Sequence, residues 1–323
     1  MPETKRKSFF QNPLVIIFGA LLCCALWGSA TPFIKLGSAA MIAKPGVPST
    51  ILFAGLRFTA AGILTIAIYS IARKKFLVPK PKSIPAILTV SSFQTVIQYI
   101  FFYIGLTNTS GVKGTILSGS SAFFCVLIAS LIFKQEKLSA RKLFACALGI
   151  AGIVVVNLNG LDLTFNFTGD GFVILSTISL AFSSVFMKKF SKYEEPVLIS
   201  GYQFIIGGIF MILVGVIFGG SVTIPDLRAA AIFIYLAALS AVAYAVWGLL
   251  LKHNPVSRVT IFSFSTPIFG TLLSMLMLDE KSNTGIVNLI ITLVLVSLGI
   301  FLLNYSRAPK SPEITSTEAN TKQ

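Results

Sequence analysis

The sequence predicts an all-α integral membrane protein with ten transmembrane helices arranged as two inverted five-helix repeats. Of its 323 residues, 55% are apolar and only 11% are charged, against about 25% charged in soluble proteins. Apolar stretches of roughly 20 residues, long enough to cross a bilayer, recur almost end to end. The second half also echoes the first: "VKGTILSGSSAF" (112–123) reappears as "SRVTIFSFSTPI" (257–268), as in a duplicated architecture.

The apolar stretches divide the chain in order. The first follows the basic run Lys5–Lys7, which imitates a secretory signal, but its length and the later spans favour an uncleaved signal-anchor. Pro79 and Asp226 mark connections between spans. Spans are expected at 14–36, 49–72, 83–105, 114–133, 143–160, 171–188, 197–219, 229–251, 259–278 and 285–305. This gives an N-terminal segment (1–13), a first repeat (14–160), a second repeat (171–305) and a polar, disordered tail (306–323).

The distribution of basic residues predicts the orientation. If the N-terminus is cytoplasmic, most of the 26 basic residues fall in cytoplasmic segments, as the positive-inside rule requires. Both termini are then cytoplasmic. Because each repeat holds an odd number of spans, the second repeat begins on the opposite side from the first. The repeats are therefore inverted, as in many secondary transporters.

Several functions are disfavoured by composition. The net charge of +15 fits basic cytoplasmic loops better than nucleic-acid binding. The four cysteines lie in apolar stretches and are interpreted as packing residues. No Asp or Glu lies well inside a span, and the only histidine, His253, lies in a connection. No metal site, catalytic residue or phosphate-binding loop is therefore expected, and neither is a cofactor.

Arg57 is the sharpest candidate for a functional residue, because it lies about nine residues into the second span. A charge at that depth costs at least roughly 2.5–3.5 kcal/mol, so it should face the bundle interior or a water-filled cavity. It could bind a carboxylate or another anion. It could equally be a structural arginine bonded to backbone carbonyls or snorkelling along its helix. Its counterpart in the second half is Gln203, which is polar but neutral.

Other polar and aromatic residues could line a substrate path. Lys35, at the end of the first span, is either a snorkelling interfacial lysine or a cavity cation. The third span carries two glutamines four residues apart, flanked by tyrosines, and this face either packs against another helix or lines a polar path. The residues of this face are Gln94, Gln98, Tyr99 and Tyr103, and Tyr244 and Trp247 occupy the corresponding stretch of the second half.

The fourth and ninth spans are both rich in small and hydroxyl residues, including Ser118 and Ser263. Small residues let helices approach closely, and packing is the favoured interpretation. The same residues would also leave room and hydrogen-bonding groups for a substrate.

Motifs in both halves resemble the drug/metabolite transporter superfamily, and most closely its EamA-type ten-helix exporters. They include "CALWGSATPFIKLG", "LRFTAAGIL" and "NPVSRVTIFSFSTPIFGTLLSMLMLDEK". The resemblance covers roughly residues 14–305. It implies a secondary carrier of the bacterial inner membrane, associated with export of amino acids and other small metabolites. The family's glutamates after the fourth and ninth spans match Glu136 and Glu280, and its first-span Trp-Gly matches Trp27 and Gly28.

The sequence therefore favours an exporter working by alternating access, with a small-molecule substrate and the lipid bilayer as partners. The oligomeric state stays open, and a monomer is compatible with the sequence. An importer or exchanger of the same fold is the nearest alternative, because gradients set the direction of a secondary carrier. A non-transporting membrane protein or a membrane enzyme is the more distant alternative.

Overall fold

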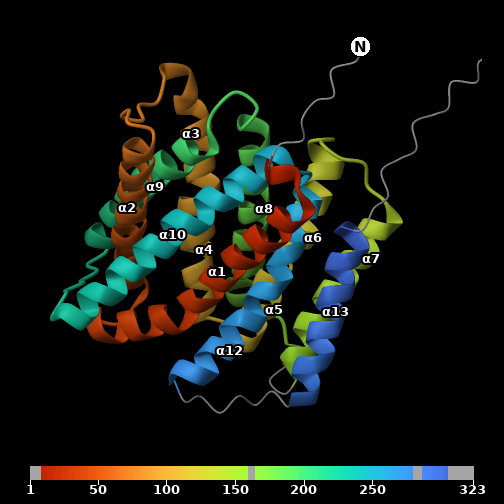
Figure 1. Cartoon of the computed structure of the whole chain (residues 1–323). Coiled ribbons are helices and arrows are strands. Elements are labelled where there is room, and N and C mark those ends of the chain that lie inside the picture. Colours follow the sequence, from red (N-terminus) through yellow and green to blue (C-terminus); the bar gives the residue numbers. More distant parts are fainter. Residues whose placement is uncertain (1–8, 159–163, 279–285, 305–323) are drawn as a thin grey trace, which may run out of the picture.

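The structure, a computed structural model, describes residues 9–158, 164–278 and 286–304. The predicted tail (306–323) and Glu280 lie outside these residues. The described chain is helical, with no β-strand among its elements (Figure 1). In the described chain, six spans are formed by one continuous helix each: α1 (Pro13–Met41), α2 (Val47–Ala72), α7 (Ala140–Val156), α9 (Pro196–Ile217), α10 (Leu227–His253) and α13 (Ile286–Asn304).

Nine helical segments of the described chain are long and apolar enough to cross a membrane. The fifth predicted span corresponds to α7 (Ala140–Val156), which has only 17 residues. That length still lies at the lower limit for crossing a bilayer. The ten predicted spans therefore all correspond to helical segments, and the predicted fold class is confirmed.

The remaining spans are built from shorter pieces. The sixth combines a π-helical turn, η6 (Phe167–Gly171), with α8 (Phe172–Phe190). The third combines α3 (Ile84–Ser91), the π-helical η3 (Ser92–Ile97) and α4 (Gln98–Thr107). The fourth consists of α5 (Gly111–Gly119), α6 (Ser121–Leu127) and η4 (Ile128–Ile132), and the ninth of α11 (Val256–Thr260), η7 (Ile261–Ser265) and α12 (Thr266–Leu278).

The breaks in the fourth and ninth spans have local causes. The Ser120 hydroxyl donates to the Leu117 carbonyl at 2.6 Å, and the Ser263 hydroxyl to the Thr260 carbonyl at 2.7 Å. Such hydroxyl bonds compete with the helical ladder. Pro267, the second residue of α12, has no N–H to continue the ladder from the preceding turn. The breaks stand at corresponding positions of the two repeats.

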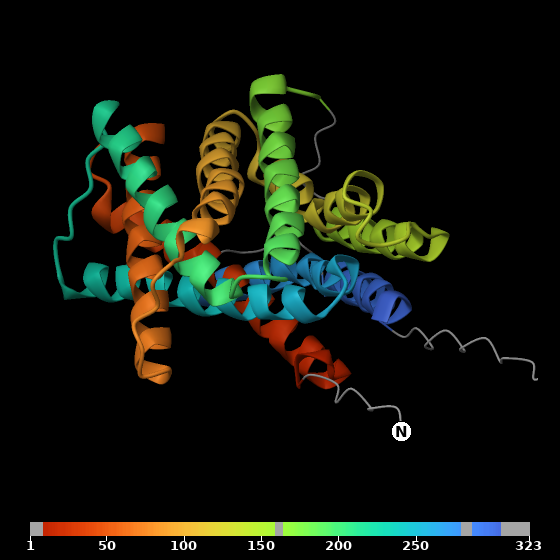
Figure 2. The same ribbon diagram turned by 90° about the horizontal axis from the view of Figure 1, so that it is seen from above.

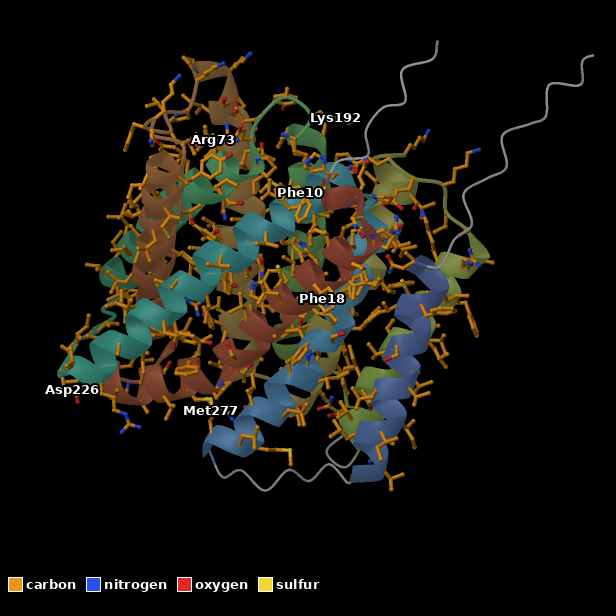
Figure 3. The ribbon with its side chains drawn as sticks, viewed as in Figure 1. Phe10, Phe18, Arg73, Lys192, Asp226 and Met277 are labelled. Carbon is orange, nitrogen blue, oxygen red and sulfur yellow. The ribbon has the colours of Figure 1, made fainter. Side chains whose placement is uncertain are left out.

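The two ends of the bundle show that the repeats are inverted. Phe10, before α1, Arg73, after α2, and Lys192, after α8, lie at one end, which we call the terminal face (Figure 3). Asp226 and Met277 lie at the opposite end, the distal face. The first helix of one repeat thus begins at the face where the first helix of the other ends.

The inverted repeats meet through α2 and α9, which pack closely along their lengths. A Cβ on Gly62 would lie 2.5 Å from the Gly201 carbonyl oxygen, and a Cβ on Gly208 would lie 2.8 Å from the Gly55 carbonyl oxygen. The two contacts are reciprocal, since Gly55 corresponds to Gly201 and Gly62 to Gly208. Only glycine permits such an approach. Viewed along the bundle, this pair and the α7–α13 pair stand at opposite edges (Figure 2).

Candidate substrate cavity

A cavity of about 1130 Å³ lies between the two edges of the bundle and receives side chains from both repeats. Its lining includes Ser110 and Gly111, which are exposed, and Met275, which is 38% exposed. These residues stand near the distal face. At the other extreme the lining ends at buried residues, Ser184 and Thr260. The cavity therefore opens at the distal face and is closed toward the terminal face.

Nearly all of the candidate residues lie on this cavity's wall. They come from six different spans and are Trp27, Lys35, Arg57, Gln94, Gln98, Tyr99, Tyr103, Ser118, Tyr244, Trp247 and Ser263. Gln203 does not line the cavity. It is fully buried, and its side-chain oxygen accepts a 2.6 Å hydrogen bond from Thr95, so it holds α9 against the third span.

Arg57 is buried, with 3% of its surface exposed, and lies on the cavity wall. Its guanidinium carbon sits 4.5 Å from the centre of the Phe58 ring, a favourable cation–π contact. Its Nε–H has no hydrogen-bond partner, and no carboxylate pairs with it in the described part of the chain. Buried charges are normally paired. In the part of the chain that the structure describes, the guanidinium therefore lies on the cavity wall with the Phe58 ring as its recorded contact.

Three more cavity residues carry buried polar atoms that lack a partner. The Trp27 indole N–H has no acceptor, the Gln98 side-chain oxygen has no donor, and the Thr266 hydroxyl is unbonded. Buried polar atoms are satisfied in the great majority of cases. These atoms lie around the same cavity as Arg57. The Trp27 N–H and the Thr266 hydroxyl could donate to an anionic group of a ligand, and the Gln98 oxygen could accept from a donor group.

Aromatic rings cover another part of the wall. Trp27 packs edge-on against Tyr244 at 5.1 Å and against Trp247 at 4.9 Å between ring centres. Tyr99 lies 4.5 Å from Phe58, and its hydroxyl is 3.3 Å from that of Tyr244. Tyr99 and Tyr244 are counterparts in the repeat, so their contact joins the halves near the pseudo-two-fold axis. Such a surface suits an apolar or aromatic part of a ligand.

The closed end is held by contacts between the repeats. Glu136, after the fourth span, accepts a 2.9 Å hydrogen bond from the Ser257 amide and a second bond from the Ser257 hydroxyl. Lys142 pairs with the same carboxylate at 2.6 Å. At the α2–α9 edge of the same face, Glu195 of the second repeat accepts from the Tyr69 hydroxyl at 2.5 Å and pairs with Arg73 at 3.1 Å. These ionic contacts fasten the halves together at the terminal face.

Some lining residues were not predicted as site residues. They include Thr31, Ser240 and Thr266. A lone hydroxyl in an apolar span costs little and is common in helix packing, so the sequence gives it no distinguishing signal.

An inverted-repeat bundle of ten helices around a cavity that opens at one face and carries several polar side chains is the architecture of a membrane transporter. Residues 14–158 and 167–305 both match the EamA-like transporter family. The chain belongs to this family, and the resemblance to EamA-type drug/metabolite transporters is confirmed.

Named relatives agree with this membership. The chain is 26% identical over 292 residues to a WAT1-related chloroplastic protein of Arabidopsis thaliana, covering 85% of this chain and 68% of the relative. It is 24% identical over 300 residues to the uncharacterized inner membrane transporter YedA of Escherichia coli, covering 90% and 93%. A solved crystal structure shares the fold, with a TM-score of 0.72 at 19% identity over 89% of this chain and 95% of that one.

Proposed function

We propose that the chain is a secondary carrier that exports small carboxylate-bearing metabolites, amino acids or related compounds, across the bacterial plasma membrane by alternating access. The observation that carries this proposal is the buried, unpaired Arg57 on the cavity wall. A carboxylate would satisfy it with charge-assisted hydrogen bonds, which are among the strongest available to a protein.

The neighbouring polar atoms support a zwitterion rather than a simple anion. The Trp27 N–H adds a donor for a carboxylate, and the Gln98 oxygen offers an acceptor for an ammonium group. The rings of Trp27, Tyr99 and Tyr244 would hold an apolar side chain. Carboxylate, ammonium and apolar groups together describe an amino acid or a close relative.

The orientation in this proposal determines which side of the membrane the open cavity faces. Basic residues crowd the terminal face, including Arg73 and Lys192, which favours a cytoplasmic terminal face. The distal opening then faces outward, and the described state is the one from which an exported compound leaves. In this state, the hydrogen bonds and the ion pair of Glu136 close the cavity toward the terminal face.

A ligand series tests the substrate class. Purified protein is screened by thermal unfolding against amino acids, their amides and their decarboxylated amines, since a bound ligand stabilises the folded state by mass action. We expect an amino acid to raise the unfolding temperature and its amide and amine to leave it unchanged. Accumulation of the same compound into inside-out proteoliposomes, at the expense of an imposed gradient, would measure export.

Two results would contradict the proposal. If the amine stabilises the protein as well as the amino acid, Arg57 does not select a carboxylate. If a stabilising ligand shows no flux in either vesicle orientation, the protein is not a carrier of that ligand class.

A further inference from the structure

A second hollow, of about 520 Å³, lies on the outside of the bundle and is lined by residues of α1, α12 and α13. Figure 1 shows where these three helices lie. It is separate from the substrate cavity and shares no lining residue with it. Its walls are almost entirely apolar and include Ile17, Phe269, Leu272 and Leu293. We call it the outer groove.

The polar end of the outer groove is formed by Arg258 and Asn304. Arg258 Nε donates to the Asn304 side-chain oxygen at 3.0 Å, which fixes the guanidinium at this position. Its two terminal nitrogens have no hydrogen-bond acceptor, and no carboxylate pairs with them, among the residues that the structure describes. The groove thus offers an oriented cation at one end and hydrocarbon surface along the rest.

The counterpart of Arg258 in the first repeat is a cation that forms an ion pair with an acid. Lys113 occupies the corresponding position in the echoed segment and pairs with Asp170 at 3.3 Å. No acid pairs with Arg258 among the residues that the structure describes. An anionic group from outside the chain would complete the charge pair.

The groove's length matches one leaflet of a bilayer. On α13 its lining runs from Leu293 to Asn304, a stretch of twelve residues that spans roughly 16 Å along the helix axis. Half of a hydrocarbon core about 30 Å thick is nearly the same depth. Arg258 stands at the terminal face, so the polar end lies at headgroup level and the apolar walls run toward the mid-plane.

From these observations we propose that the outer groove is a binding site for an anionic phospholipid of the terminal-face leaflet. The phosphate binds the free nitrogens of Arg258, and one acyl chain lies along Leu272 and Leu293. Basic pockets between membrane helices are suited to acidic headgroups. Because α1 and α12 form part of the substrate cavity on their other faces, the lipid fills the space beside two helices that must move during transport.

Native mass spectrometry of the full-length protein in detergent, titrated with phosphatidylglycerol, tests the site. We expect Arg258→Gln to weaken the resolved lipid-bound state about tenfold, the loss typical of one charge-assisted contact, and Arg258→Lys to keep part of it. Arg141→Gln, the same change at an exposed residue of the same face outside the groove, should have no effect. Ser297→Trp, which fills the groove without changing charge, should weaken binding as Arg258→Gln does.

Thermal unfolding of each variant identifies any that fail to fold. If Arg258→Gln fails to fold, lipid binding by the conservative Arg258→Lys variant tests the proposal in its place. Equal lipid binding by the wild type and Arg258→Gln would overturn the proposal. So would an equal loss in Arg141→Gln, which would indicate attraction by the whole basic face. Displacement of the lipid by glycerol 3-phosphate, which has the headgroup chemistry without a chain, would indicate a soluble phosphate site instead.

Discussion

Arg57 combines two properties that rarely occur together, burial and the absence of a charged partner. Keeping a charge away from water without a partner costs free energy, and the cation–π contact with Phe58 returns only part of it. A protein retains such a cost where function requires it. Stability and transport should therefore respond in opposite directions when this residue is neutralised.

The first prediction is that Arg57→Gln reduces transport while raising stability. Losing a charge-assisted contact of about 1.5–3 kcal/mol weakens the apparent affinity for a carboxylate substrate roughly 10- to 150-fold. Removing an unpaired buried charge should raise the unfolding temperature of the ligand-free protein. Proteoliposome flux and thermal unfolding of the same preparation measure the two effects.

Arg57→Lys is the matched control, because lysine keeps the charge but cannot form the two parallel bonds of a guanidinium. It should lie between the wild type and Arg57→Gln in affinity. A fall in stability of Arg57→Gln, together with unchanged affinity, would show that the arginine is structural.

At the residue scale, a buried functional charge is easier to predict from the sequence than the direction in which a neutral polar side chain of a helix points. Arg57 could be predicted because any charge at membrane depth is a thermodynamic outlier. The position of Gln203 could not be predicted, because a glutamine can bond to a ligand in a cavity or to a neighbouring side chain. Here Thr95 donates to its side-chain oxygen, while its amide nitrogen has no hydrogen-bond partner in the described part of the chain. The contact of Tyr99 with Tyr244 needs the packed structure, since it depends on how two helices rotate about their axes.

At the scale of elements, α2 and α9 form the tightest contact between the repeats. At Gly55, Gly62 and Gly208 the backbone of the facing helix lies within 3 Å of the position that a Cβ would occupy. The broken spans are different: the third, fourth and ninth carry most of the polar lining and contain π-helical or 3-10 turns. The closely packed pair α2–α9 therefore forms the scaffold, and the irregular helices around the cavity form the candidate site.

The second prediction is that Gly62→Ala destabilises the protein by about 1–3 kcal/mol, the usual cost of overpacking. Its new Cβ would lie 2.5 Å from the Gly201 carbonyl oxygen and 2.8 Å from the Ile205 amide nitrogen, so the helices must separate. Gly111→Ala is the control, because nothing lies within 4 Å of its Cβ position. Thermal unfolding compares the two, and equal stability would contradict the close approach.

The third prediction concerns the contact that closes the terminal face. Glu136→Gln removes the charge that Lys142 and the Ser257 amide bind, and so weakens the closed state. A cysteine introduced at Ser118, on the cavity wall, should then react several-fold faster with an impermeant maleimide applied from the terminal side. Lys137→Gln, an exposed neighbour, should leave the rate unchanged. An unchanged rate in Glu136→Gln would exclude the carboxylate from the closure.

The elements illustrate which structural signals a sequence contains. The spans followed from hydrophobic length, which the bilayer imposes directly. The breaks within them did not, because Ser120, Ser263 and Pro267 perturb a helix only through local hydrogen bonds that leave its average hydropathy unchanged. The π-helical turn that carries Gln94 has no sequence signature of its own.

At the scale of the whole molecule, inversion and charge asymmetry act together. The terminal and distal faces differ in basic content although the repeats share a fold, and this difference sets how the protein enters the membrane. Duplication alone would leave both orientations equally stable.

The fourth prediction is that labelling of introduced cysteines is strictly sided. Lys192→Cys, at the terminal face, should react with an impermeant reagent only in inside-out vesicles, and Asp226→Cys, at the distal face, only in right-side-out vesicles. Reaction of both from one side would contradict the inverted topology. Exchange of the two patterns would instead mean that the distal opening faces the cytoplasm.

The reciprocal glycine contact has a consequence for how such a molecule can evolve. Gly62 against Gly201 and Gly208 against Gly55 form the kind of interface that two identical subunits build about a two-fold axis, each offering the same patch to the other. A homodimer of a five-helix ancestor, its subunits inserted in opposite directions, could form it without any change. Such a dimer must carry the same residue at both symmetric positions. Once the gene is duplicated, as in this fused chain, one copy can keep an arginine, Arg57, while the other holds a glutamine, Gln203.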